Sequence, residues 1–292
     1  MNISVIGSGV VGNIVGEGLK ELGHQVIFYD IDAKAVERIK NKGYNATQDI
    51  EYAISESEIS FICVPTPTEE EKINLSYIKS ATENVAKSLK NKNSYHLITI
   101  KSTIVPTTVE KVIIPILEKF SGKIPGKGFG VCMNPEFLTE IANTWTDDAN
   151  FSRGFFDEER IVIGELDKKS GDLLEELYKN LGKPIFRTDL KTAEFIKYAA
   201  NCALANRISY WNEMFLISKQ LGIDSNLVAS IVGMDKRIGK YGTVHGKGYG
   251  GKCLSKDTKA FISWAKKHHN PILLKAVDSI NEKMKKEYGV RE

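Results

Sequence analysis

The chain has 292 residues, of which 42% are hydrophobic and 26% charged, as in an ordinary globular protein of one large or two average domains. The formal net charge of +3, from 40 basic and 37 acidic residues, gives no general attraction to nucleic acid or to a membrane surface. Apolar runs are too short to span a bilayer, and the first residues lack the pattern of a signal peptide. We therefore expect a cytoplasmic protein with no nucleic-acid or membrane partner.

The first part of the chain alternates short apolar strands with amphipathic helices, which is typical of a parallel sheet covered by helices. Strands are expected over residues 3–6, 26–29, 59–64, 97–101 and 129–133, with one or two more over 160–164 and 184–187. Helices are expected over residues 11–22, 77–89 and 108–119. This pattern predicts an α/β fold, a Rossmann-type doubly wound parallel sheet over residues 1–190.

The remainder of the chain has a different, helical character. Residues 191–221 form one helical pattern without glycine or proline, and a shorter helix is expected over 225–232. A glycine-rich loop at 239–251 precedes two further helices over 257–267 and 271–286. Residues 191–292 are therefore expected to form an all-helical central or dimerisation domain. A two-domain plan predicts a cleft between the domains, where ligands usually bind.

A glycine motif follows the first expected strand and begins the first helix. Gly7 permits a tight turn, Gly9 lets the backbone approach a pyrophosphate, and Gly12 lets helix and strand pack closely. Asp30 ends the second strand, 18 residues after Gly12, where a carboxylate accepts hydrogen bonds from the adenosine ribose and repels a 2′-phosphate. The cofactor predicted from this context is NAD, and the same turn adds Val10 and Val11 to the expected contacts.

The four cysteines do not have the spacing of metal ligands, and no metal is expected. Cys63, Cys132 and Cys202 stand in apolar segments and are expected to be inert core residues. Cys253 follows a glycine pair and has lysines on either side, which favours an accessible thiolate.

The long helical pattern carries a lysine and an amide four residues apart. Lys197 and Asn201 share one helix face, where they can together stabilise an oxyanion. The neighbours of Lys197 are apolar, so we expect its face of the helix to be buried.

Five segments together resemble the UDP-glucose/GDP-mannose dehydrogenase family over residues 1 to about 274: VPTPT (64–68), KSTIVP (101–106), NPEFLTE (134–140), EFIKYAAN (194–201) and KGYGGKCLSKD (247–257). The resemblance implies a four-electron oxidation, in which the primary alcohol of a nucleotide sugar becomes a carboxylate and two NAD are reduced. It also implies that Cys253 forms a thiohemiacetal and then a thioester with the substrate.

The resemblance assigns roles to single residues. Lys197 and Asn201 would stabilise oxyanions, Asp257 and Glu136 would handle protons and orient water, and Thr103 would help hold that water. The implied cofactor contacts, beyond the glycine turn, are Val64, Pro65, Thr66, Ser102, Thr103, Glu140 and Lys256. The implied sugar-nucleotide contacts are Glu136, Phe137, Leu138, Lys197, Asn201, Arg237, Tyr249 and Gly250.

The family also implies a homodimer packed through the long helix, whose apolar residues lie on more than one face. Relatives continue into a third domain that holds the nucleotide. The present 292 residues are thus expected to bind NAD well but to oxidise a nucleotide sugar weakly or not at all on their own.

Two other functions are compatible with parts of the pattern. A β-hydroxyacid dehydrogenase shares the two-domain plan and the lysine–asparagine pair, but it needs no cysteine. A shortened homologue that binds NAD as a regulatory partner needs no catalytic residues. The presence of Cys253, Lys197, Asn201 and Asp257 together argues against that second alternative.

Overall fold

The computed structural model describes residues 1–138, 145–146 and 154–291, which fall into two compact units. Unit 1 contains Met1–Pro67, Asn74–Leu138 and Gly154–Lys197, and unit 2 contains Thr68–Ile73, Thr139–Arg153 and Tyr198–Glu292. The division falls inside one helix, α7 (Leu190–Leu221), whose first turns belong to unit 1. The domain boundary expected after residue 190 stays a prediction.

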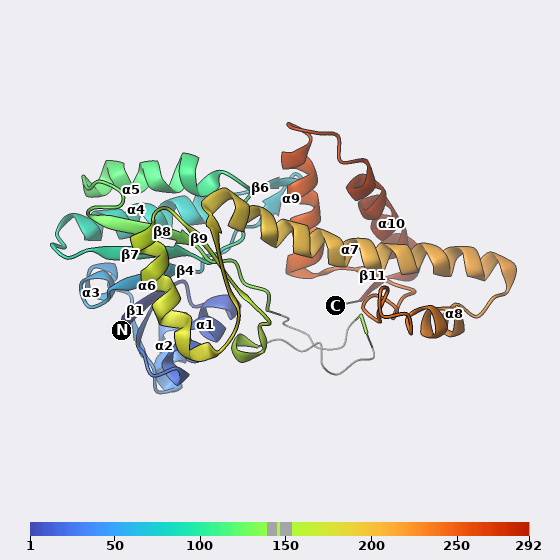
Figure 1. The fold of residues 1–292 in the computed structure, drawn as a ribbon, viewed down its shortest axis with the longest axis horizontal. Helices are drawn as coiled ribbons and strands as arrows, with labels where there is room; N and C mark the ends of the chain where they lie inside the picture. Colours follow the sequence, from blue (N-terminus) through green and yellow to red (C-terminus); the bar gives the residue numbers. More distant parts are fainter. Residues whose placement is uncertain (139–144, 147–153, 292) are drawn as a thin grey trace. The chain divides into compact units, whose positions relative to one another are not determined.

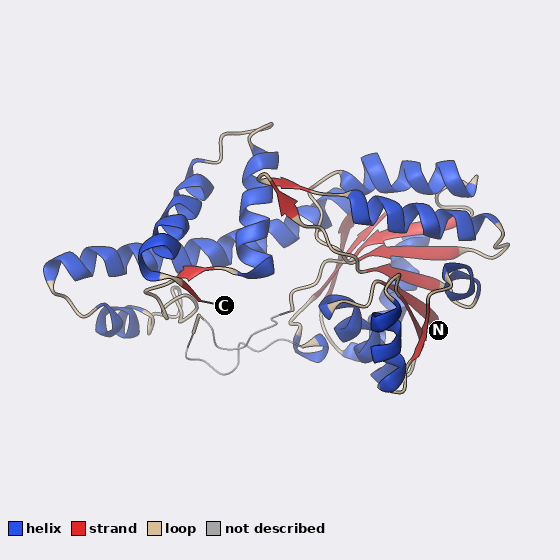
Figure 2. Cartoon of the chain, turned by 180° about the vertical axis from the view of Figure 1, so that it is seen from behind, coloured by secondary structure: helices blue, strands red, loops and turns tan. Residues whose placement is uncertain are grey.

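Unit 1 is built on one eight-stranded sheet with the order β10-β9-β8-β7-β4-β1-β2-β3 (Figures 1 and 2). Its strands are β1 (Asn2–Ile6), β2 (Gln25–Tyr29), β3 (Asn45–Thr47), β4 (Ile59–Ile62), β7 (His96–Ile100), β8 (Phe129–Met133), β9 (Ile161–Glu165) and β10 (Ile185–Asp189). Strands β1, β2, β3, β4, β7 and β8 pair in parallel, which confirms the Rossmann-type fold. The sheet is not wholly parallel as expected, because β9 pairs antiparallel to β8, while β10 is parallel to β9.

Helices cover both faces of this sheet. Figure 1 shows α4 and α5 over one face and α1 and α6 over the other. The helical elements are α1 (Val10–Glu21), α2 (Ala33–Asn41), α3 (Ile50–Ser55), α4 (Ser76–Lys90), a π-helical turn (Val109–Ile113) that leads into α5 (Ile114–Ser121), α6 (Lys168–Tyr178), and the 3-10 turns Phe155–Asp157 and Lys179–Leu181. Helices α2, α3 and α6 were not expected, although each begins after an aspartate whose carboxylate caps the first turn.

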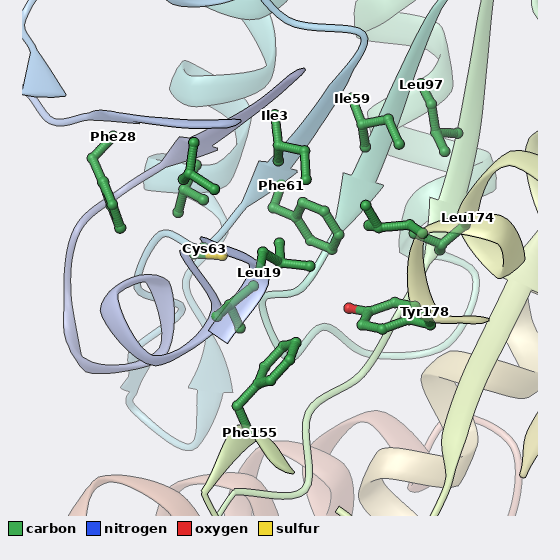
Figure 3. Close-up of a cluster of buried hydrophobic side chains, with 14 of the residues drawn as sticks. Ile3, Leu19, Phe28, Ile59, Phe61, Cys63, Leu97, Phe155, Leu174 and Tyr178 are labelled. Carbon is green, nitrogen blue, oxygen red and sulfur yellow. The ribbon is translucent and has the colours of Figure 1, made fainter. Parts of the chain in front are cut away.

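A large hydrophobic cluster of unit 1 lies between the sheet and helices α1 and α6. Figure 3 shows Ile3, Ile59, Phe61 and Leu97 from the strands together with Leu19, Leu174 and Tyr178 from these helices. Cys63 and Cys132 belong to the same buried cluster. Near-continuous apolar strands are the pattern of a parallel sheet that is buried on both faces.

Unit 2 is mainly helical, with α7, α8 (Ser225–Val232), α9 (Lys256–Ala265) and α10 (Ile272–Tyr288). It also contains two short sheets, β5 (Thr68–Glu69) with β6 (Lys72–Ile73) and β11 (Gly248–Tyr249) with β12 (Val290–Arg291). The glycine-rich segment expected to be a loop therefore contributes a strand, and residues Gly251–Ser255 form a π-helical turn before α9. Within the described ranges, no helix has both the length and the apolarity to cross a membrane.

Candidate active site

The candidate residues of unit 1 follow the carboxyl ends of parallel strands. Gly7 follows β1, Asp30 follows β2, and Val64 lies two residues past β4. Ser102 lies two residues past β7, and Glu136 lies three past β8. Because these strands are parallel, their carboxyl ends meet at one edge of the sheet, the usual ligand site of such folds.

The glycine turn has the geometry that a dinucleotide requires. Gly7 has φ +98°, and a Cβ there would lie 3.0 Å from the carbonyl oxygen of Cys63. A Cβ on Gly12 would lie 1.9 Å from the Gly7 carbonyl oxygen, so only glycine allows α1 to pack this closely. A Cβ on Gly9 would meet nothing within 4 Å, which leaves open space at the N-terminus of α1. Open space beside unpaired helix N–H groups fits the pyrophosphate of NAD.

Asp30 connects the glycine turn to the end of β2. Its Oδ2 accepts hydrogen bonds from the backbone N–H and the hydroxyl of Ser8, both at 2.7 Å, and its Oδ1 accepts from the Asp32 N–H at 3.0 Å. The carboxylate is thereby held at the strand end, where the ribose of a dinucleotide is recognised.

The loops after β4 and β7 are hydrogen-bonded to each other. The Thr66 hydroxyl donates to the carbonyl oxygen of Thr103 at 2.7 Å, and the Ser102 hydroxyl donates to the carbonyl oxygen of Val64 at 2.7 Å. Four of the expected cofactor contacts, Val64, Thr66, Ser102 and Thr103, are therefore brought together. A fifth, Pro65, lies between Val64 and Thr66 in the chain.

A fully buried carboxylate supports the second of these loops. Glu194, the fifth residue of α7, accepts hydrogen bonds from the backbone N–H groups of Thr107 at 2.5 Å and Val109 at 2.8 Å. Thr107 has φ +74°, a left-handed conformation that is unfavourable for threonine. Burial raises the pKa of Glu194 to about 7 despite these backbone donors, with the Glu110 carboxylate acting in the same direction.

Lys197 and Glu136 form a buried ion pair. The Lys197 ammonium donates to Glu136 Oε1 at 2.8 Å and to the Glu136 carbonyl oxygen at 2.7 Å, and Glu136 Oε2 accepts from the Leu138 N–H at 2.7 Å. Burial alone would raise the pKa of Glu136, but the Lys197 ammonium outweighs it and lowers the pKa overall. The expected burial of Lys197 is confirmed, since the residue is 4% exposed.

Asn134 organises the segment that carries Glu136. Its Oδ1 accepts hydrogen bonds from the Lys101 ammonium at 2.9 Å and the Tyr178 hydroxyl at 2.7 Å, and its Nδ2 donates to the Val162 carbonyl oxygen at 2.8 Å. Neither Asn134 nor Glu194 was among the candidate site residues. Both residues lie in segments that carry the family resemblance, and that location is the one feature of the sequence that could have identified them as site residues.

In unit 2, Asn201 and Asp257 form a second buried pair. The Asn201 side chain donates to Asp257 Oδ2 at 2.7 Å, and the Lys256 ammonium donates to Asp257 Oδ1 at 2.5 Å. Asp257 is 1% exposed, and the Thr68 hydroxyl donates to the Lys256 carbonyl oxygen at 3.1 Å. These contacts hold the first turn of α9 against α7.

Cys253 lies in the π-helical turn that leads into α9, and it is exposed. The other three cysteines are buried, as expected, and burial raises the pKa of the Cys63 and Cys202 thiols to about 12. A π-helical turn is often found at functional sites, and the N-terminal end of a helix favours an anion such as a thiolate. In the described parts of the chain, no group of three or more His, Cys, Asp or Glu side chains is placed to hold a metal ion.

The remaining candidate residues differ in how far their side chains are buried. The Tyr249 side chain is buried in the core of unit 2, with its ring edge-to-face against Trp145. The Arg237 side chain is exposed and pairs with Asp235 at 2.7 Å. The Phe137 ring lies 4.1 Å from the Arg160 guanidinium. Gly250 follows β11, whereas Glu140 lies outside the described residues.

The glycine turn, the carboxylate after β2 and the edge of the parallel sheet define a dinucleotide-binding domain of the NAD type. The chain belongs to the UDP-glucose/GDP-mannose dehydrogenase family. Residues 1–45 and 38–182 match the NAD binding domain of this family, and residues 191–283 match its central domain.

Curated relatives include a UDP-glucose 6-dehydrogenase of Haloferax volcanii, 36% identical over 97% of this chain and 70% of the relative. A GDP-mannose 6-dehydrogenase of Pseudomonas aeruginosa is 35% identical over 89% of this chain and 63% of the relative. The chain thus spans 63–70% of the length of these two relatives.

Solved structures give the same family. A UDP-glucose dehydrogenase from Pyrobaculum islandicum has a TM-score of 0.88 at 33% identity, covering 98% of this chain and 68% of that one. A GDP-mannose dehydrogenase from Pseudomonas aeruginosa has a TM-score of 0.75 at 32% identity, covering 98% and 69%. A 3-hydroxyisobutyrate dehydrogenase of Mycobacterium tuberculosis, with a TM-score of 0.73 at 15% identity over 100% of this chain and 96% of that one, shares the fold alone.

Proposed function

We propose that this chain takes part in the NAD-dependent oxidation of the primary alcohol of a nucleotide sugar to a carboxylate, of the UDP-glucose to UDP-glucuronate type. The observation that carries the proposal is the exposed position of Cys253 in the turn that begins α9, four residues before the buried Asp257. An accessible thiol beside a helix N-terminus suits a covalent mechanism.

The chemistry proceeds in two oxidations and one hydrolysis. NAD held by the glycine turn and Asp30 would supply the hydride acceptor for both oxidations. Loss of a hydride from the carbon that carries the alcohol, with loss of the hydroxyl proton to a base, would give an aldehyde. The Cys253 sulfur then adds to the aldehyde carbon, and the resulting thiohemiacetal loses a hydride and a proton to become a thioester. Water attacks the thioester carbonyl and releases the carboxylate and the thiol. Two NAD are reduced and one water is consumed for each sugar.

Side chains of the candidate site suit these steps. The Lys197 ammonium and the Asn201 amide are hydrogen-bond donors one turn apart on α7, and they would stabilise the oxyanions. The lowered pKa of Glu136 keeps its carboxylate ionised, so it can orient the attacking water and accept a proton. Thr103 would help hold that water. Asp257 would exchange protons with the alcohol and hemiacetal oxygens.

The binding roles follow the same division of the chain. We assign NAD to residues 1–190, through Gly7, Gly9, Gly12 and Asp30 with the loops after β4 and β7, and the catalytic cysteine loop to the helical region 191–292. Arg237 and Gly250 would contact the sugar nucleotide, together with Phe137 and Leu138, whereas the buried Tyr249 would hold the segment before Gly250 in place.

We further propose that two copies of the chain pair through unit 2. A stripe of exposed residues follows α7 at Ala199, Ala203, Tyr210, Ile217 and Leu221, which recur at helical spacing. Exposed apolar residues also lie on α8 and the following turn, where Leu227, Ile231 and Met234 are 57%, 60% and 76% exposed. Many exposed apolar side chains on one unit often mark a protein interface.

A trapped intermediate tests the covalent mechanism. The variant Glu136→Gln, incubated with NAD and UDP-glucose or GDP-mannose, should slow hydrolysis. Mass spectrometry of the digested protein should then detect the sugar nucleotide bound to the peptide that contains Cys253. The same incubation with the added substitution Cys253→Ser should give no thioester. An adduct on another residue, or normal acid formation by Cys253→Ser alone, would contradict the mechanism.

A further inference from the structure

The segment that leads to Cys253 is held by side-chain amides rather than by a strand of a large sheet. Strand β11 comprises only Gly248 and Tyr249, and its one strand partner is the two-residue β12. Backbone polar groups that are buried in such a short strand need other hydrogen-bond partners. Two buried asparagines supply them.

The first asparagine is Asn281 of α10, which is 0% exposed. Its Oδ1 accepts a hydrogen bond from the Tyr249 N–H at 2.7 Å, and its Nδ2 donates to the Tyr249 carbonyl oxygen at 3.0 Å. One side-chain amide therefore satisfies both backbone groups of Tyr249, as a neighbouring strand would.

The close approach of β11 to α10 depends on a glycine. A Cβ on Gly248 would lie 2.8 Å from the backbone nitrogen of Lys285 and 3.0 Å from the carbonyl oxygen of Asn281. Because the backbone of α10 cannot give way easily, the Gly248 position is fixed against this helix. The Asn281 amide then fixes the next residue along the chain.

The second asparagine is Asn212 of α7, also 0% exposed. Its Oδ1 accepts from the Gly246 N–H at 2.9 Å, and its Nδ2 donates to the Lys247 carbonyl oxygen at 2.9 Å. The two amides thus hold the segment 246–249 from two different helices. Beyond it, only Gly250 separates Tyr249 from the π-helical turn that contains Cys253.

We propose that Asn281 is a positioning residue for Cys253, because its amide fixes the Tyr249 peptide groups and thereby the start of the π-helical turn that presents the thiol. This inference rests on the proposed role of Cys253 in the reaction. A leucine of similar size would fill the same volume, but it would leave the N–H and C=O of Tyr249 buried without these two partners. The backbone that leads into the π-helical turn would then no longer be held in one position.

The test measures the chemistry of the thiol itself, without NAD or sugar. The rate of alkylation of Cys253 by iodoacetamide is followed from pH 6 to pH 10 by peptide mass spectrometry, which separates Cys253 from the three buried cysteines. We expect Asn281→Leu to lower the rate at pH 7 roughly threefold or more and to move the midpoint of the pH profile upward, because a displaced turn no longer holds the thiolate at the helix N-terminus. Asn281→Asp keeps the acceptor for the Tyr249 N–H and should have a smaller effect.

A matched control separates positioning from loss of stability. Met284 lies on the same helix, is 0% exposed, and makes none of the hydrogen bonds to the segment 246–249 described above. Met284→Ala should lower the melting temperature through the cavity it leaves, and it should leave the alkylation profile unchanged. The inference is overturned if Asn281→Leu keeps the wild-type profile, or if Met284→Ala shifts the profile as much. Since no turnover is measured, a failure of the proposed function would appear separately, as normal sugar oxidation by Cys253→Ser.

Discussion

The Lys197 ammonium donates to the Glu136 carboxylate at 2.8 Å, with the two side chains only 5% and 10% exposed. Removal of one partner of such a buried pair leaves an uncompensated charge, which typically costs about 3–5 kcal/mol of unfolding free energy. We therefore predict that Lys197→Met is strongly destabilising and that the double variant Lys197→Met, Glu136→Gln recovers much of the loss. Urea unfolding of the two single variants and the double variant measures this coupling. Strictly additive effects would show that the pair does not interact as the geometry requires.

Asp30 is predicted to select NAD over NADP. Loss of hydrogen bonds to a charged group costs roughly 1.5–3 kcal/mol, so Asp30→Ala should weaken NAD binding by about 10- to 150-fold in calorimetric titration. The wild-type chain should bind NADP much more weakly than NAD. Asp32→Ala is the matched control, because that carboxylate caps α2 by accepting from the Lys34 N–H. It should cost about 1 kcal/mol of stability and leave NAD affinity unchanged. Equal affinity of the wild type for NAD and NADP would refute the role of Asp30.

The sequence predicted the fold where its patterns were long and regular. The strand at residues 129–133 and the helix at 225–232 have the expected bounds, and α7 differs from its expected start by one residue. Helix α3 was missed because six residues cover less than two turns, too few for a periodic pattern. The antiparallel β9 was not foreseen, since strand direction depends on the path of the chain and not on composition.

The candidate site residues were predicted from sequence motifs. The residues that hold the site loops in place could not be predicted in this way. Lys197 and Cys253 stand in segments with a recognisable spacing. In contrast, Asn281 bonds to Tyr249, 32 residues earlier, and Glu194 bonds to Thr107, 87 residues earlier. A lone asparagine or glutamate in a helix has no pattern that reports a partner at such a distance. Those contacts became visible only in three dimensions.

Glu194 should make stability depend on pH. Its pKa is raised from an ordinary 4.5 to about 7, so the folded chain binds this proton more tightly than the unfolded chain. The stability that protonation provides is complete below about pH 4.5 and is lost as the pH rises towards 7. Relative to Glu194→Gln, the wild type should thus lose up to about 3 kcal/mol between pH 4.5 and pH 8, at 1.36 kcal/mol for each pKa unit.

The charged groups near Glu194 give a control for this pH dependence. Glu110 comes from the adjoining π-helical turn and raises the pKa of Glu194, whereas Lys191 and Lys197 lie one turn away on α7. Glu110→Gln should therefore move the transition to lower pH, as measured by urea unfolding over the same pH range. A difference between wild type and Glu194→Gln that stays constant with pH would contradict the assignment.

The apolar surface of unit 2 is predicted to be a dimer interface. Leu227→Asp combined with Ile231→Asp should convert a dimer into a monomer in light scattering at micromolar concentration, with unchanged circular dichroism, because two carboxylates would have to be desolvated. Ile124→Asp is a matched control, since Ile124 in unit 1 and Ile231 are both 60% exposed. That control should remain dimeric. A wild-type chain that is only monomeric would refute the interface.

The number of NADH formed for each sugar consumed tests the central claim most directly. A limiting amount of UDP-glucose, and separately of GDP-mannose, is incubated with excess NAD until absorbance at the NADH band stops rising, and the product is identified by mass spectrometry. The four-electron mechanism through Cys253 predicts two NADH for each sugar and a carboxylate product, with no carboxylate from Cys253→Ser. One NADH for each sugar with an aldehyde or ketone as the final product, or two NADH from Cys253→Ser, would contradict it.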